Sequence, residues 1–200
     1  MRTTLIALLA AAATLASTPA FGSDVERGRE LARTECVACH GEDGNSVAPT
    51  FPKLAGLQPE YLAKQLREYL EGRRTNEMMV PVLEKMTSAD VEPLALWFGS
   101  QKMSPGTVTD PQLAQAGRAI YLDGNPDAGV PACMGCHLEN GAGNPRFPRI
   151  AGQHQEYTVQ QMLQFRSGER SNDRGRVMRT IASRMTDQEM KAVAEYIAGM

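Results

Sequence analysis

The 200-residue sequence lacks the marks of several large protein classes. After the first 20 residues, no apolar run is long enough to cross a bilayer, which excludes a polytopic membrane protein. No alternating strand pattern stands out, so we expect an all-α chain. Acidic and basic residues nearly balance, at a formal net charge of −2, and nothing indicates binding to nucleic acid.

The first residues have the pattern of a secretory signal peptide. Arg2 supplies a positive charge, and residues 5–15 form an apolar stretch too short to span a bilayer. Small residues at Ala20 and Gly22 suit cleavage, although an uncleaved anchor is the alternative. We expect residues 1–22 to be removed and the mature chain to be exported to the periplasm of a bacterium.

Cysteine and histidine are scarce, with four and three residues, and all but one of them fall in two pentads. Residues 36–40 and 133–137 both read C-x-x-C-H. This spacing is the attachment signature of a c-type haem, because two thiols on one helical turn reach both vinyl groups and the next histidine ligates the iron. A thioredoxin-like pair, half of a zinc site or a disulfide would suit a single copy. Two copies with no cysteine left over favour haem.

The sequence around the pentads is also duplicated. The motif F-P-x-[LI]-A-G occurs at residues 51–56 and 147–152, an offset of 96, and an insertion of three residues later moves the offset to 99. A tandem repeat predicts two similar domains, here 23–103 and 104–200, joined by a linker at residues 99–111. Each is small for an independent core, and a covalent haem would supply apolar volume.

Hydrophobic spacing and helix-start signals indicate helices throughout both halves. The predicted helices span residues 24–34, 59–71, 88–98, 155–167 and 187–198. We expect the first and last helix of each half to cross, with Gly28 near Trp97 and Gly117 near Tyr196, since a glycine inside a helix permits close packing.

An iron with one histidine needs a second axial ligand or keeps an open position. His154 is the only remaining histidine, so two bis-histidine irons cannot be built from one chain, and we expect it to be a surface or capping residue. Methionine is plentiful, at 11 residues, and a methionine ligand favours ferrous iron. Two pairs recur at the 99 offset, Met79 with Met178 and Met86 with Met185.

The second of these pairs has another predicted role. Met86 and Met185 directly precede capping threonines, at the position where a side chain packs on the following helix. Met79 and Met178 have no such role and are the predicted ligands.

Pro52 and Pro148 follow their histidines by 12 and 11 residues. An iron-bound histidine usually donates its other ring N–H to a carbonyl, and proline offers a carbonyl on a backbone of fixed φ. We predict that these prolines orient the two histidines. A simple turn proline is the alternative.

With these motifs in register twice, the chain resembles the di-haem cytochrome c4 family over residues 24–200. The resemblance implies two class I cytochrome c domains related by a pseudo-twofold axis, each with one covalent haem. The implied haem-attachment residues are Cys36, Cys39, Cys133 and Cys136. The implied axial pairs are His40 with Met79 and His137 with Met178. Pro81, close after Met79, departs from expectation and leaves Met78 open as an alternative to Met79.

The resemblance also implies a function. We expect a periplasmic electron carrier, with no catalytic residues, that passes electrons from a cytochrome bc complex to a haem–copper oxidase or another periplasmic acceptor. Such a carrier can also associate peripherally with the membrane. One alternative is a di-haem subunit of a flavoprotein such as sulfide dehydrogenase. Another is a di-haem enzyme, either a peroxidase or a thiosulfate dehydrogenase, which would need an open position or a different ligand at one iron.

Overall fold

The computed structural model describes residues 21–200, and every named element in that range is a helix or helical turn. The predicted signal peptide, residues 1–22, lies almost wholly outside this range. Within it the only extended pairings are two isolated bridges, Asn125 with Val130 and Asn144 with Phe147. The prediction of an all-α chain is confirmed.

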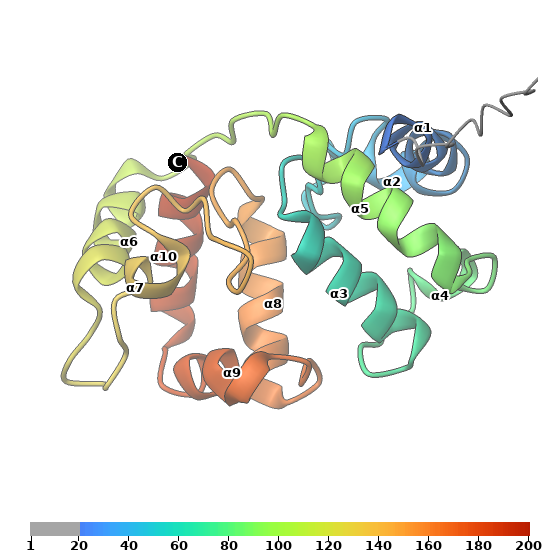
Figure 1. Cartoon of the computed structure of the whole chain (residues 1–200). Coiled ribbons are helices and arrows are strands. Elements are labelled where there is room, and N and C mark those ends of the chain that lie inside the picture. The colour runs from blue at the N-terminus through green and yellow to red at the C-terminus, as the bar shows by residue number, and fades with distance from the viewer. Residues whose placement is uncertain (1–20) are drawn as a thin grey trace, which may run out of the picture.

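Two groups of helices follow one another along the chain (Figure 1). The first group is α1 (Phe21–Leu31), a π-helical turn (Ala32–Cys36), α2 (Val37–His40), α3 (Pro59–Leu70), α4 (Val80–Leu83), a 3₁₀ turn (Ser88–Asp90) and α5 (Val91–Ser100). The second is α6 (Pro111–Asp123), α7 (Met134–His137), α8 (Gln155–Ser167), a 3₁₀ turn (Arg174–Arg176), α9 (Val177–Ala182) and α10 (Asp187–Ala198). The predicted bounds of the helices at 155–167 and 187–198 match α8 and α10.

In each group the first and last helix cross at a glycine, as predicted. A Cβ atom on Gly28 would lie 1.9 Å from the Pro93 carbonyl oxygen and 2.9 Å from Trp97 Cβ, so α1 and α5 touch backbone to backbone. A Cβ on Gly117 would lie 1.9 Å from the Ala192 carbonyl oxygen. Ala192 corresponds to Pro93 at the offset of 99, so both crossings lie about one turn before the aromatic residue expected there, Trp97 or Tyr196.

The last helix of each group starts with a capping box. Thr87 and Asp90 cap the first, and Thr186 and Glu189 cap the second, each pair exchanging side-chain and backbone hydrogen bonds. Asp90 also accepts from Arg27 at 2.6 Å, which ties α1 to the start of the last helix.

The linker is shorter than predicted. Because α5 continues to Ser100 and α6 begins at Pro111, the connection spans 101–110. Side chains from both domains hold it. Lys53 Nζ donates to the Ser104 carbonyl at 2.9 Å, and the backbone N–H of Thr109 donates to Glu195 at 3.0 Å.

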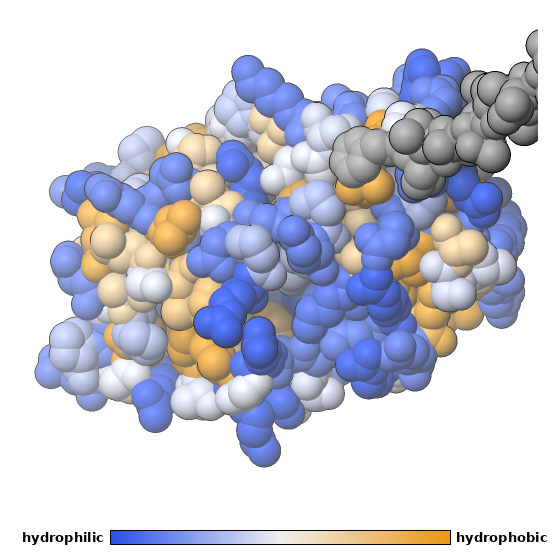
Figure 2. All heavy atoms as spheres, in the orientation of Figure 1, coloured by the Kyte–Doolittle hydropathy of each residue, from blue (hydrophilic) through white to orange (hydrophobic). Residues whose placement is uncertain are grey.

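The two domains meet at α3 and α8, which lie side by side at the centre of Figure 1. Arg74 donates to Gln65 of its own domain at 2.7 Å and to Gln161 of the other at 3.1 Å. Arg170 mirrors this, with 2.7 Å to Gln161 and 3.2 Å to Gln65. The reciprocal bonds place a pseudo-twofold axis between the helices. Figure 2 shows mostly hydrophilic residues along this seam.

Candidate functional site

The two pentads form corresponding turns, α2 and α7, with the histidine at the end of each. His40 and His137 are 8% and 9% exposed. His40 Nδ1 lies 2.9 Å from the Pro52 carbonyl oxygen, and His137 Nδ1 lies 2.8 Å from that of Pro148. Since a carbonyl only accepts, each Nδ1 carries the proton. Each Nε2 is then a free lone pair, and it has no hydrogen bond within residues 21–200.

The environment keeps both imidazoles neutral. Burial lowers the pKa of His40 and of His137 below the usual value, and the hydrogen bonds to the two prolines only partly oppose this effect. Phe51 and Phe147 lie edge-on to the two rings, at 6.4 Å and 6.3 Å between centroids. A neutral, oriented imidazole with an unused Nε2 is what an iron ligand requires.

All four thiols of the pentads are free and partly exposed. Burial, followed by the nearby charge of Glu35, raises the pKa of Cys36 to about 12, and burial raises the pKa of Cys133 to about 11. Both of these thiols are therefore neutral at neutral pH when nothing is bound to them. Among the described residues, no group of three or more His, Cys, Asp or Glu could hold a bare metal ion.

The first cysteine of each pentad packs against the hydrophobic core cluster of its domain. The residues that pack against the same core cluster as Cys36 include Leu54, Leu66, Leu70 and Met86. In the second domain, the residues in the cluster with Cys133 include Ile150, Leu163, Met178 and Met185. Leu54 and Ile150 come from the repeated F-P-x-[LI]-A-G motif. An apolar cluster in contact with these cysteines' helical turns suits the attachment of an apolar group.

The predicted methionine ligands differ between the domains. Met178 packs against the cluster that contains Cys133, whereas Met79 is partly exposed and lies outside the corresponding cluster. Met78 is 62% exposed. Pro81 occupies the first turn of α4, just after Met79, where a missing N–H costs nothing, so its position is compatible with Met79 at the start of that helix.

Taken together, these residues fit a haem c at each pentad. Each site offers two unpaired thiols three residues apart, a neutral histidine with an unused Nε2, and a nearby apolar core cluster. The chain carries two covalently attached haems.

His154 is the N-cap residue of α8, in line with the prediction of a surface or capping residue, although its ring makes no capping hydrogen bond. Its Nε2 instead lies 2.9 Å from Ser46 Oγ and 3.0 Å from the Ser46 carbonyl oxygen in the other domain. Gln58, the aligned residue, makes the reciprocal contact by donating to the Ala142 carbonyl at 2.5 Å. The pair joins the domains, which no local pattern around His154 predicts.

Sequence reasoning also missed the residue after the second histidine. Leu138 has φ +67°, a value that favours glycine, and the aligned residue in the first domain is Gly41, with φ +78°. The Tyr121 hydroxyl donates to the Leu138 carbonyl at 2.6 Å and holds this turn in place. Aligning the two copies would have shown the exchange of glycine for leucine.

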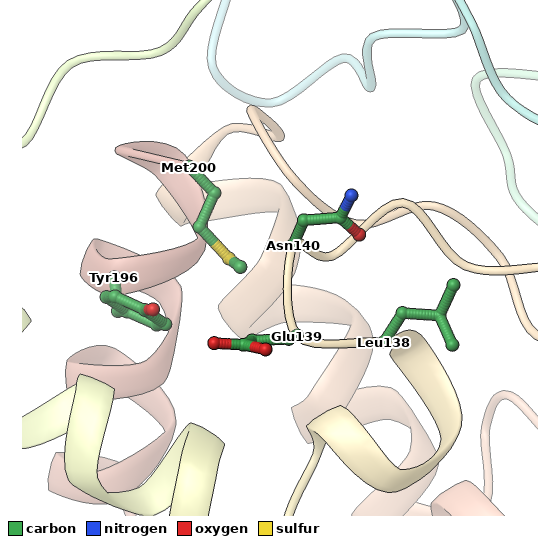
Figure 3. A pocket seen from close by; sticks show the side chains of 5 residues that line it. All are labelled: Leu138, Glu139, Asn140, Tyr196 and Met200. Carbon is green, nitrogen blue, oxygen red and sulfur yellow. The ribbon is translucent and has the colours of Figure 1, made fainter.

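A hollow of about 620 Å³ lies beside this turn (Figure 3). It is lined by Leu138, Glu139, Asn140, Tyr196 and Met200. In the close-up, Glu139 points toward Tyr196 while Leu138 points away. None of the predicted haem-attachment or iron-ligating residues lines it.

Comparison with known proteins identifies the family of the whole chain. The cytochrome c family model matches residues 25–103 and 114–200. A cytochrome c4 of Thiocapsa roseopersicina is 44% identical, over 92% of this chain and 96% of that protein. The crystal structure of reduced recombinant cytochrome c4 from Pseudomonas stutzeri superposes with a TM-score of 0.83 at 39% identity, covering 88% of this chain and 98% of that one. A thiosulfate dehydrogenase electron acceptor of Thiomonas intermedia is 36% identical, over 82% and 77%.

Proposed function

Because this chain belongs to the cytochrome c family, as a di-haem electron-transfer cytochrome of the c4 type, we propose that it carries electrons in the periplasm from a cytochrome bc complex to a terminal haem–copper oxidase. Each bound haem iron supplies a reversible one-electron change. The protein holds the iron in place, excludes water and sets its potential. Among residues 21–200, no helix is long and apolar enough to span a membrane.

The repeated pairing of a buried histidine with a proline carbonyl supports this function most strongly. In the proposal, Pro52 and Pro148 fix the imidazoles of His40 and His137 so that each Nε2 points at an iron. Cys36, Cys39, Cys133 and Cys136 hold the two haems through thioether bonds. The domains are residues 23–103 and 104–200.

Met79 and Met178 are the residues that we propose would bind the irons together with His40 and His137. An iron bound by both a histidine and a methionine would have no position left for a substrate, so the proposed role is that of a carrier and not of an enzyme. Met78 is a poor candidate because most of its side chain is in solvent. Met86 is the stronger alternative to Met79 as the iron ligand of the first domain, because it packs against the same core cluster as Cys36.

The ligand assignment is tested by replacing methionine with leucine, which keeps the volume and removes the sulfur. Met79→Leu and Met178→Leu should each abolish the weak methionine–iron absorption band of one haem and lower its reduction potential, because methionine stabilises ferrous iron. Met86→Leu is the matched control and should leave band and potential unchanged. Loss of the band in Met86→Leu instead would move the first-domain ligand to Met86.

A second candidate function is electron acceptor of a thiosulfate dehydrogenase. The relative of that name in Thiomonas intermedia favours this function, since the match covers 82% of the present chain. The fold and the carrier chemistry would be the same, but the donor would differ. Reduction of the purified protein by a thiosulfate dehydrogenase and thiosulfate, faster than by a reduced cytochrome bc complex, would support this donor. A flavoprotein partner would instead be recovered as a stable complex on purification.

A further inference from the structure

The segments that carry Met79 and Met178 differ in charge. We define the first methionine segment as residues 77–85 and the second as residues 173–184. The first contains two glutamates and one lysine, a net charge of −1. The second contains one aspartate and four arginines, a net charge of +3. Part of this difference comes from the three-residue insertion just before the second segment's helix.

Several of these charges face solvent without a partner. Arg174 and Arg176 are exposed, and neither forms an ion pair within the described part of the chain. Arg179 is neutralised by Asp173 at 2.6 Å. Arg184 donates to the carbonyl of Gly129 at 2.6 Å and keeps its charge. The second methionine segment therefore presents three uncompensated cations to the solvent.

The first methionine segment presents the opposite sign. Glu77 and Glu84 are exposed and have no ion-pair partner among residues 21–200, whereas Lys85 is paired with Glu35 at 3.1 Å. Helix α4 is part of the first methionine segment and helix α9 is part of the second. The two helices lie at separate places on the molecule in Figure 1. The two faces could thus meet different partners.

The backbone of the second segment brings its cations next to the proposed ligand. Gly175 and Arg176 have φ +62° and +60°, and this left-handed region is strained for an arginine. Val177, directly between Arg176 and Met178, is 38% exposed. A partly exposed valine, preceded by two exposed arginines, is therefore the residue directly before the proposed ligand.

We propose that the second methionine segment is the docking surface for an acidic redox protein, which exchanges electrons with the second-domain haem. The proposal rests on the function above, in particular on Met178 as a ligand. Unpaired surface cations attract an acidic partner and orient it during encounter, and they speed association by roughly 10- to 1,000-fold. A membrane surface is the less suitable occupant, because the segment presents one partly exposed valine and no broad apolar face to insert.

The test compares the holoprotein with the double variant Arg174→Glu/Arg176→Glu. A control, Arg118→Glu/Lys191→Glu, changes the net charge equally at exposed residues of α6 and α10. The probe is a gold electrode with a carboxylate-terminated monolayer, which stands in for an acidic protein surface. We expect the segment variant to slow interfacial electron transfer about tenfold at low salt, and the control less than about twofold.

Equal rates for the wild type and the segment variant would overturn the proposal, and so would an equal loss in the control. So would salt-resistant binding of the wild type to phosphatidylglycerol vesicles that the segment variant loses, since that result would assign the segment to a membrane. Every protein is first checked for two covalent haems and the methionine–iron band. A wild type that fails this check contradicts the proposed function. A wild type that passes it but matches the segment variant at the electrode contradicts the docking proposal alone.

Discussion

The two domains are alike around the histidine and differ in the turn that follows it. In both, a buried imidazole binds a proline carbonyl and the first and last helices cross at a glycine. After the histidine, the first domain has Gly41 and the second has Leu138, although both residues have positive φ. The turn therefore needs this backbone shape more than it needs glycine.

Another residue supports the leucine in the second domain. Tyr121 is fully buried and donates to the Leu138 carbonyl at 2.6 Å. When the helix glycines are aligned, Ala32 is its counterpart in the first domain and has no hydroxyl to donate. The first domain thus forms the turn with a glycine, which adopts positive φ freely. The second domain forms it with a leucine that a hydrogen bond from Tyr121 holds in place. Two haems held by equal ligands would then sit in unequal surroundings, which is a basis for two different potentials.

The largest effect is expected where the domains agree. Gly28→Ala and Gly117→Ala each place a Cβ atom 1.9 Å from a backbone carbonyl oxygen of the crossing helix, and backbone cannot move aside as a side chain can. Each substitution should lower the free energy of unfolding by about 3 kcal/mol or more. Denaturant unfolding of the holoprotein measures this.

Gly135→Ala is the matched control, since a Cβ there meets no protein atom within 4 Å. Its effect should stay within about 0.5 kcal/mol. A similar small effect for Gly28→Ala would mean that the α1–α5 crossing is looser than described.

A smaller effect is expected where the domains differ, at the turn after the histidine. Gly41→Leu should cost about 1–3 kcal/mol, because the first domain has no tyrosine to hold a side chain at positive φ. Leu138→Gly should relieve strain but increase the entropy of the unfolded chain, for a net change below about 1 kcal/mol. Thermal unfolding of both holoproteins measures the contrast, and equal losses in the two variants would refute the distinction.

The smallest effect concerns pH. Hydrogen bonds from Arg27 and from Thr87 lower the pKa of Asp90, and hydrogen bonds from Thr186 and Asn125 lower the pKa of Glu189. A carboxyl whose pKa is lower in the folded state stabilises the fold above its unfolded pKa, about 4, and loses that contribution as the pH falls through the folded value.

Asp90→Asn and Glu189→Gln should therefore each cost about 1 kcal/mol at pH 7 and much less near pH 2. Urea unfolding at both pH values measures the difference. A loss for Asp90→Asn that does not change with pH would show that its charge contributes nothing.

The sequence predicted those features that are local or repeated. The pentads, the capping boxes and the bounds of α8 and α10 depend on residues within a few positions of each other, and duplication supplied a second copy of each. The bonds between the domains were not predicted. Gln153 makes two hydrogen bonds with the backbone of Lys53, 100 residues away, at 2.9 Å each. Such pairs leave no periodic pattern, because the two partners meet only after both domains have folded.

The linker and the first helix were also misjudged, for physical reasons. Gly99 suggested a break, but it lies inside α5, where a Cβ atom would come within 2.7 Å of the Pro59 ring and glycine is needed for packing. At the other end of the domain, α1 gives way after Leu31 to a π-helical turn that ends at Cys36. The predicted helix over 24–34 did not anticipate this wider turn.

We predict that each iron is bound by a histidine and a methionine of the protein. A spectroscopic redox titration of the purified protein tests this most directly, because it counts haems and reports ligation together. We expect two covalent haems per chain, two one-electron transitions and a methionine–iron band for each haem. One haem per chain, or a high-spin iron that rapidly binds an added ligand, would contradict it.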